Sequence, residues 1–201
     1  MGIWSDKLIY QKGFVLNQTN QALFQDLYFD YDPLNKVFWC EDIDIAPGCV
    51  SAHHHVHKID PFTGAVTSIP GNYTWFMRGL KCDPARNNFW FYETTGTVYK
   101  YKLTAGKLHP VMTVSLYCWI EEIEVDLVTG DLWIVSSSDL YLLDGGSGSQ
   151  KTKITGFGKL LDIDCNHYDR SLWAADYDRS CVVRIPTAGL KNKTYPQSSF
   201  P

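Results

Sequence analysis

The feature that most constrains the fold is an internal repeat of about 42 residues. Four turn-like segments end in glycine, at Gly64, Gly106, Gly148 and Gly189, and successive glycines lie 42, 42 and 41 residues apart. Glycine suits the positive φ that closes such a turn. A period of this length indicates that the chain builds its core by placing copies of one small unit side by side.

Each repeat also contains an earlier turn that leads into a strand marked by tryptophan. The tryptophans that follow these turns are Trp39, Trp90, Trp133 and Trp173. The turns begin at aspartates, whose side chains commonly accept main-chain hydrogen bonds in turns; they are Asp32, Asp83, Asp126 and Asp164. Two hairpins in 42 residues make four strands, which is the size of one β-propeller blade. No segment keeps a helical hydrophobic period, and an aromatic content of 14% suits strands.

The repeats predict an all-β chain that folds as one small β-propeller domain over residues 1–201. Complete blades are expected over residues 25–70, 76–115, 119–155 and 158–196, and residues 1–24 are expected to form an outer pair of strands. The first blade carries an insertion between Cys40 and about His55, because Trp39 to Gly64 takes 25 residues where the other blades take 15 or 16. A five-bladed ring with one incomplete blade is favoured over a four-bladed ring with a flap, and a piece of a six-bladed ring also fits the repeat.

The tryptophan strands resemble those of the YWTD and NHL-type β-propeller superfamily. The matching stretches are residues 38–41, 89–92, 132–135 and 172–176, and residues 98–103 resemble the third strand of such blades. The resemblance covers about residues 7–195 and implies a propeller. Relatives include extracellular ligand-binding modules and metal-dependent lactonases or lyases, so it implies either a binding function or metal-assisted chemistry.

The composition argues against several kinds of partner. A net charge of −4 does not favour a nucleic-acid-binding surface. No run of 18 apolar residues is present, so no membrane span is expected. The chain contains no GxSxG, GxGxxG or P-loop sequence, so it predicts neither a serine nucleophile of that type nor a nucleotide site.

Cysteines and glycosylation sequences favour an extracellular setting. Six cysteines without a CxxC pair, and sequons at Asn17, Asn72 and Asn192, predict a secreted glycoprotein, although the first residues do not have the pattern of a signal peptide. The expected disulfides join Cys40 to Cys49, Cys82 to Cys118 and Cys165 to Cys181. The alternative is that several of these cysteines are buried free thiols.

The first strand of each blade alternates between apolar and charged residues. Aligned on the turn aspartates, the apolar positions are Phe29, Leu80, Ile123 and Leu161, followed by Tyr31, Cys82, Val125 and Ile163. The opposite positions are charged: Asp30, Lys81, Glu124 and Asp162. Because inner strands line the channel of a propeller, these residues are expected to form a ring that either holds a divalent cation or polar ligand, or is a solvated wall in which Lys81 balances the acids. The second interpretation is favoured.

A histidine cluster lies in or beside the insertion of the first blade. On a strand, His53, His55 and His57 would share one face, where neutral imidazoles can chelate Zn²⁺ or Cu²⁺. The alternatives are an exposed polar loop, which is favoured, and a pH-sensitive contact.

The rim at the starts of the inner strands is the expected binding surface. It would contain Trp75, Arg78, Trp119, Glu121 and Glu122. The predicted function is a secreted, non-enzymatic binding or scaffold module that presents this rim to a protein or small molecule through aromatic and charged contacts, with no catalytic residue and no firm cofactor. The alternative is a metal-dependent lactonase- or lyase-type enzyme using Ca²⁺ or Zn²⁺. Self-association by strand addition at the half-blade is a further prediction.

Overall fold

The computed structural model describes residues 28–45, 52–69, 78–188, 190 and 193–194. Four sheets are formed by the described residues, and within each one the consecutive strands of the repeat pair in chain order. The first sheet contains β1 (Tyr28–Asp32), β2 (Val37–Ile45), β3 (Ala52–Ile59) and β4 (Val66–Ile69). The second contains β5 (Arg78–Asp83), β6 (Asn88–Glu93), β7 (Thr97–Thr104) and β8 (Lys107–Ser115).

The other two sheets continue the repeat, although the fourth has three described strands where a complete blade of four was expected over residues 158–196. The third contains β9 (Glu122–Val125), β10 (Leu132–Ser136), β11 (Asp139–Leu143) and β12 (Gln150–Thr155). The fourth contains β13 (Leu160–Asn166), β14 (Ser171–Asp176) and β15 (Cys181–Pro186). The short strand β16 (Lys193–Thr194) pairs in parallel with β12 at the outer edge of the third sheet. Within the described ranges the chain forms no α-helix, only a 3-10 turn at Pro84–Arg86, and no helix that could span a membrane.

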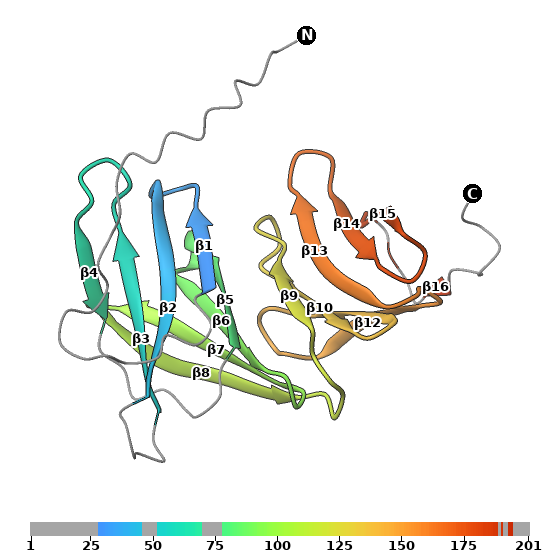
Figure 1. The fold of residues 1–201 in the computed structure, drawn as a ribbon, viewed down its shortest axis with the longest axis horizontal. Helices are drawn as coiled ribbons and strands as arrows, with labels where there is room; N and C mark the ends of the chain where they lie inside the picture. The colour runs from blue at the N-terminus through green and yellow to red at the C-terminus, as the bar shows by residue number, and fades with distance from the viewer. Residues whose placement is uncertain (1–27, 46–51, 70–77, 189, 191–192, 195–201) are drawn as a thin grey trace, which may run out of the picture.

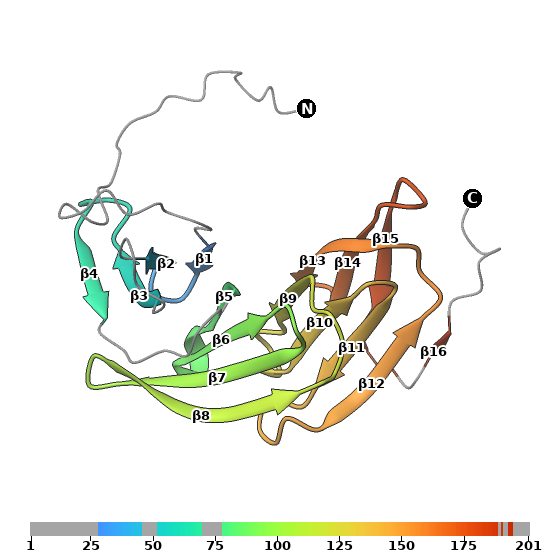
Figure 2. The same cartoon turned by 60° about the horizontal axis from the view of Figure 1, so that its bottom comes forward.

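The four sheets are arranged as the blades of a β-propeller, as the repeat predicted (Figure 1). The inner strands contact one another in chain order, β1 with β5, β5 with β9 and β9 with β13. Figures 1 and 2 show the first and fourth sheets standing apart, so the described blades form an open arc. The outer strand pair expected from residues 1–24 lies outside the described residues, and the preference for five blades is therefore not shown.

The core lies between neighbouring blades and is built around the repeated tryptophans. The ring of Trp39 meets that of Phe89 in the second sheet edge to face, with ring centroids 4.7 Å apart. Trp90 belongs to the cluster between the second and third sheets, and Trp133 to the cluster between the third and fourth. These three side chains are buried, as expected, whereas Trp173 is 40% exposed because no described sheet follows the fourth.

The first sheet shows the matching exposure at the other end of the arc. Phe29 and Tyr31 are 53% and 46% exposed, whereas the residues in register with them in the second and third sheets are buried. Each blade therefore offers a tryptophan-bearing face to the following blade and an apolar face to the preceding one, and the two end faces of the arc are uncovered by described residues.

The register of the fourth sheet corrects the alignment made from the turn aspartates. In the first three sheets the charged residues Asp30, Lys81 and Glu124 lie opposite the tryptophans of the second strands. In the fourth sheet Asp164, and not Asp162, lies opposite Trp173. The apolar positions shift by two residues as well: Ile163 and Cys165 are buried, and Leu161 is 44% exposed. The cause is that two further residues separate Asp164 from Trp173, so Asn166 takes the turn position.

The turns themselves bear out part of the aspartate prediction. Asp32 accepts the main-chain N–H of Asn35 at 2.8 Å, and Asp126 accepts that of Val128 at 2.9 Å. Asn166 has this role in the fourth sheet, where it accepts the N–H of Tyr168 at 3.0 Å. Asp83 differs, because its carboxylate instead binds the Arg86 guanidinium at 3.0 Å. The glycines that end the outer turns, Gly64, Gly106 and Gly148, have φ of +74°, +74° and +73°, as expected.

The insertion in the first blade and the three predicted disulfides also need correction. The inserted residues lengthen the hairpin of β2 and β3, so the histidines lie on a strand and not in a loop. No disulfide is formed by the described cysteines, which are Cys40, Cys82, Cys118, Cys165 and Cys181. The three predicted bridges, from Cys40 to Cys49, from Cys82 to Cys118 and from Cys165 to Cys181, are therefore wrong. Cys82 and Cys165 instead fill apolar positions between blades. Cys49 and the three sequon asparagines, Asn17, Asn72 and Asn192, lie outside the described residues.

Gly145 lies in a turn of the third sheet that packs directly against the main chain of Gly130. A methyl group there would overlap the main-chain carbonyl of Gly130, whereas a methyl at Gly146 would meet only Asp144 Oδ1, at 3.3 Å. We expect Gly145→Ala to lower the free energy of unfolding by about 2 kcal/mol through overpacking. The matched change Gly146→Ala should cost about 0.5 kcal/mol or less. Urea unfolding of both variants measures the difference, and equal losses would contradict the packing.

Candidate functional site

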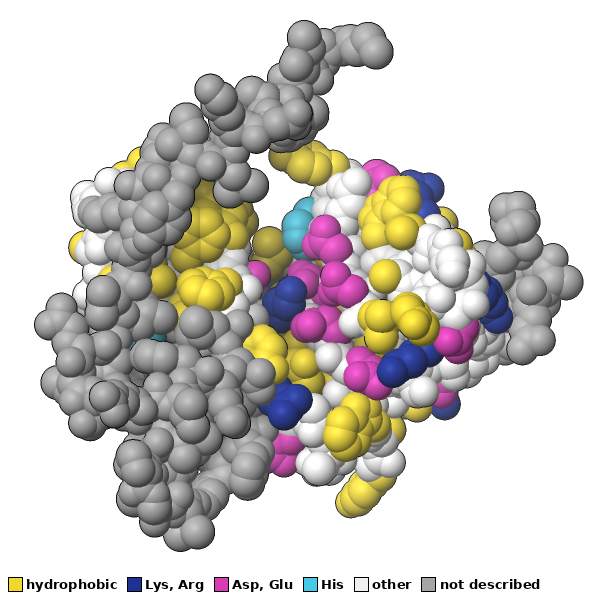
Figure 3. Space-filling model, in the orientation of Figure 1, with side chains coloured by type: hydrophobic (Ala, Val, Ile, Leu, Met, Phe, Trp, Pro, Cys, Tyr) yellow, Lys and Arg dark blue, Asp and Glu magenta, His cyan; other side chains and the backbone are white. Residues whose placement is uncertain are grey.

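The charged residues of the inner strands line one cavity at the hub of the arc. Its charged walls are Asp30 from β1, Lys81 from β5, Glu124 from β9 and Asp164 from β13. We call this space the hub cavity; its volume is about 260 Å³. It is also lined by residues of the turns that follow the inner strands, including His167. Figure 3 shows acidic side chains gathered at the centre of the arc, next to basic side chains and a histidine.

Lys81 and Glu124 form the central ion pair of the hub cavity. Lys81 Nζ lies 2.8 Å from Glu124 Oε2, and both side chains are largely buried. Burial would by itself lower the pKa of Lys81, but the Glu124 and Asp30 carboxylates raise it above its ordinary value. Burial raises the pKa of Glu124 to about 7, although Lys81 opposes that shift. Glu124 is therefore a carboxyl group that exchanges its proton near neutral pH.

The remaining acids leave the hub with more negative than positive charge. Asp30 Oδ2 accepts the main-chain N–H of Cys82 at 2.7 Å, and burial raises the pKa of Asp30. Glu122 and Asp162 lie one step nearer the starts of the inner strands, where each accepts the N–H of the next residue at 2.9 Å. Burial also raises the pKa of Glu122. Lys81 is the one lysine or arginine among the described residues that line the hub cavity, which also contains His167.

The predicted charged ring is thus assembled, with Asp164 in place of Asp162. The favoured interpretation, a wall in which Lys81 balances acids, agrees with the ion pair to Glu124. Among the described residues no three His, Cys, Asp or Glu side chains form a group that could hold a metal ion. Burial raises the pKa of the Cys82 and Cys165 thiols, so neither is present as a thiolate nucleophile at neutral pH.

The structure does not bring the histidine cluster to the hub. His57 lies on β3 opposite Cys40, and its Nδ1 is 2.9 Å from Ser68 Oγ on β4. This places His57 inside the first sheet, as a buried structural side chain. The backbone of β3 puts His53 and His55 on the same face as His57, but their side chains lie outside the described residues.

The rim residues lie at the opposite end of the inner strands from the turns that line the hub cavity. Arg78 begins β5 and Glu122 begins β9. The buried Tyr92 hydroxyl donates to the main-chain oxygen of Glu121 at 2.8 Å, and burial together with Glu122 raises the pKa of Tyr92. Trp119 is exposed, and Trp75 lies outside the described residues. The sequence analysis thus predicted the rim and the hub as separate sites. It did not assign Asp164 and His167 to the hub, because the longer turn of the fourth sheet shifts their register.

Comparisons with known proteins support the fold alone. No protein-family model matches the sequence, and no protein with a curated description matches it. Among solved structures, the chain is similar to a Bacteroides fragilis protein provisionally described as a 6-phosphogluconolactonase, with a TM-score of 0.58 and 14% identity. The match covers 79% of this chain and 49% of that one, so the chain spans about half the length of that protein. The likeness shows a propeller, and the YWTD or NHL-type assignment is not confirmed by it.

Proposed function

We propose that the chain is a non-enzymatic binding module whose hub cavity takes a small organic cation. The observation that carries the proposal is the charge of the cavity wall, where Asp30, Glu124 and Asp164 face a single Lys81. Lys81 is already paired with Glu124. Asp30, whose Oδ2 accepts the Cys82 N–H, and Asp164 are therefore left without an ion pair among the described residues. An amine of a ligand can form charge-assisted hydrogen bonds with these two groups, and a partly enclosed cavity strengthens such bonds.

The exposed rim supports a binding role at the other end of the inner strands. Trp119 is an exposed aromatic side chain, and Arg78, Glu121 and Glu122 add charge near it in the sequence. Aromatic and charged side chains of this kind anchor protein partners. We place a protein or small-molecule contact at this rim as part of the same proposal, together with an extracellular location.

Binding to the hub is tested with putrescine and its neutral counterpart 1,4-butanediol. Isothermal titration calorimetry should detect putrescine and not butanediol. Asp164→Asn removes one free carboxylate and should weaken putrescine binding about tenfold, which corresponds to about 1.4 kcal/mol. The control Asp139→Asn, which removes an acid paired with Lys153 on an outer strand, should leave binding unchanged. Equal binding of the diol and the diamine would overturn the proposal.

The second candidate is a lactone hydrolase, which rests on Glu124. A buried carboxyl group with a pKa of about 7 beside a lysine has the protonation behaviour of a general base. The provisional name of the structural neighbour points to the same reaction class. The excess of acids at the hub disfavours a phosphorylated substrate, because like charges repel. The substrate class of this candidate is therefore a neutral sugar lactone.

The enzyme candidate has its own assay. Hydrolysis of glucono-δ-lactone is followed by titrating the acid released, with Ca²⁺, with Zn²⁺ and with EDTA. Catalysis that falls at least a hundredfold in Glu124→Gln would support the hydrolase over the binding module. A rate equal to the uncatalysed rate under all three conditions would reject the hydrolase and leave the binding proposal standing on the putrescine result.

A further inference from the structure

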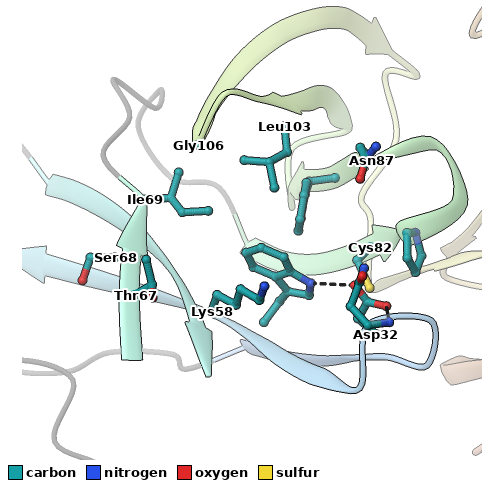
Figure 4. Close-up of a pocket in the computed structure, with 13 residues that line it drawn as sticks. Asp32, Lys58, Thr67, Ser68, Ile69, Cys82, Asn87, Leu103 and Gly106 are labelled. Atoms are coloured by element: carbon teal, nitrogen blue, oxygen red, sulfur yellow. Dashed lines mark hydrogen bonds between the residues drawn. The ribbon is translucent and has the colours of Figure 1, made fainter. Parts of the chain in front are cut away.

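A second cavity lies between the first and second sheets, away from the hub charges. Its volume is about 330 Å³, within the range of small-molecule sites. Its apolar wall is formed by Trp39, Ile69, Phe89 and Leu103, and Lys58 contributes a cationic side chain (Figure 4). We call this space the interblade cavity.

The Asp32 carboxylate at one end of the interblade cavity is already satisfied by the protein. Its oxygens accept the main-chain N–H and the side-chain amide of Asn35, both at 2.8 Å. Asp32 Oδ2 also accepts a hydrogen bond from the Trp39 Nε1–H group at 3.3 Å, which Figure 4 draws as a dashed line. Asp32 is buried. Its oxygens are therefore not offered to a ligand, and Lys58 is the charged group that a ligand would meet.

The repeat provides an internal comparison for Lys58. Lys58 lies opposite Trp39 in the first sheet, and Lys100 lies opposite Trp90 in the second, so the two lysines occupy equivalent positions. Lys100 is only 6% exposed. Its Nζ lies 5.0 Å from the centroid of the Trp90 ring and donates a hydrogen bond to the main-chain oxygen of Gly145 in the third sheet.

The carbonyl that satisfies Lys100 comes from a long turn that the second sheet does not have. Residues 144–149 connect β11 to β12, with Gly148 N–H bonded to Asp144 O at 2.8 Å, and this turn reaches Lys100. In the second sheet Thr104 already pairs with Lys107, so the turn between β7 and β8 contains only Ala105 and Gly106. Gly106 lines the interblade cavity. Lys58 is exposed, and its ammonium has no hydrogen-bond acceptor within the described part of the chain.

We propose that the interblade cavity binds a small carboxylate with an apolar body. The carboxylate would accept a hydrogen bond from Lys58, as the Gly145 carbonyl accepts one from Lys100. The apolar body would fill the space beside Trp39, Leu103 and Phe89, which the longer turn would otherwise cover. An anion suits the site better than a neutral carbonyl, because Lys58 is the one lysine on the described wall of the cavity and charge-assisted bonds are the stronger ones. The site is separate from the hub cavity, although Cys82 lines both.

The test uses 2-naphthoate, with neutral 2-naphthalenemethanol as the matched compound. Calorimetry should show that the full chain binds naphthoate at least tenfold more tightly than the alcohol. The substitution Lys58→Met keeps an apolar stem of similar length at an exposed position. It should remove the preference for naphthoate over the alcohol. The control Lys36→Met, which changes an exposed lysine in the turn between β1 and β2, should bind naphthoate as the parent chain does. Equal affinity for the two compounds, or an unchanged preference in Lys58→Met, would overturn the proposal.

A second variant tests the cavity independently of the lysine. Replacing residues 104–107 by a copy of residues 144–149 should place a main-chain carbonyl over Lys58 and fill the cavity. We expect this graft to lose naphthoate binding at least tenfold while it keeps putrescine binding at the hub. Undiminished naphthoate binding in the folded graft would place the ligand elsewhere and overturn the proposal. Should the graft not fold, as judged by circular dichroism, Lys58→Met decides the question alone.

Discussion

Replacing Trp133 by alanine is expected to lower the free energy of unfolding by about 4 kcal/mol, whereas Trp173→Ala should cost about 1 kcal/mol. The two residues occupy the same position of the repeat, each opposite an acid of the inner strand. Trp133 is fully buried against the fourth sheet, in contact with the cluster that contains Leu172 and Ile163. Its removal opens a cavity as well as losing transfer free energy. Trp173 is 40% exposed, so water already reaches much of its surface.

Urea unfolding followed by far-ultraviolet circular dichroism measures both losses, and equal slopes in urea show that the same surface unfolds. The two variants are matched in chemistry and in strand position. The difference between their losses of unfolding free energy therefore measures the contribution of the neighbouring blade. Similar losses for the two variants would contradict the described arc, because they would mean that Trp173 is covered in solution as Trp133 is.

Replacing Lys81 by methionine should have the second largest effect, and the effect should depend on pH. The change leaves Glu124 buried without its cation, and breaking such a pair costs about 3 kcal/mol when the remaining carboxylate is charged. The folded pKa of Glu124 already lies at about 7, above its ordinary value, and should rise further in the variant. We expect the variant to lose about 1.4 kcal/mol more at pH 8 than at pH 5, because pH 8 lies about one unit above the parent pKa and Glu124 is protonated in both chains at pH 5.

The direction in which stability changes with pH follows from proton binding. A carboxyl group whose folded pKa is raised binds its proton more tightly in the folded state, so stability is greatest in acid and falls as the pH rises toward that pKa. For the parent chain, Glu124 contributes a decline between about pH 4.5 and pH 7, and the raised pKa values of Asp30 and Glu122 act in the same direction. The raised pKa of Lys81 acts in the same direction but only in alkali, because its stabilising contribution is fully present below the ordinary lysine pKa and is lost as the pH rises above it.

Thermal and urea unfolding between pH 5 and pH 8 test this prediction. The double variant Lys81→Met with Glu124→Gln should recover most of the stability at pH 8, because no buried charge is left unpaired. A loss in Lys81→Met that is the same at pH 5 and pH 8, or that the second change does not restore, would show that Lys81 acts through packing and not through Glu124.

The blade pattern was predictable from sequence because it depends on local rules repeated four times. Turn glycines with positive φ, alternating inner strands and tryptophans on the second strands each follow from residue type and spacing. The charged ring could be predicted for the same reason at Asp30, Lys81 and Glu124. The prediction was wrong at Asp162, because the turn of the fourth sheet is two residues longer and shifts the register of β13 against β14. Only the pairing of these two strands shows that Asp164 takes the position.

The cysteine and histidine predictions failed or stayed untested for a different reason. A cysteine suits a disulfide and a buried apolar position equally well, and which one it fills depends on the neighbouring blade. Cys82 and Cys165 lie between sheets, where burial and not bridging explains them. His57 is likewise enclosed by its own sheet and bonded to Ser68.

By itself, the sequence determined that the chain forms propeller blades, where each blade turns, and which strand faces carry charge, because these properties are set by short-range geometry and alternate with fixed periods. Only the tertiary structure decided which charges meet at the hub, which end faces stay uncovered and where a cavity opens between blades. Those outcomes depend on the contact between segments distant in the chain. A difference of a few residues in one turn is enough to bury Lys100 and to leave Lys58 exposed.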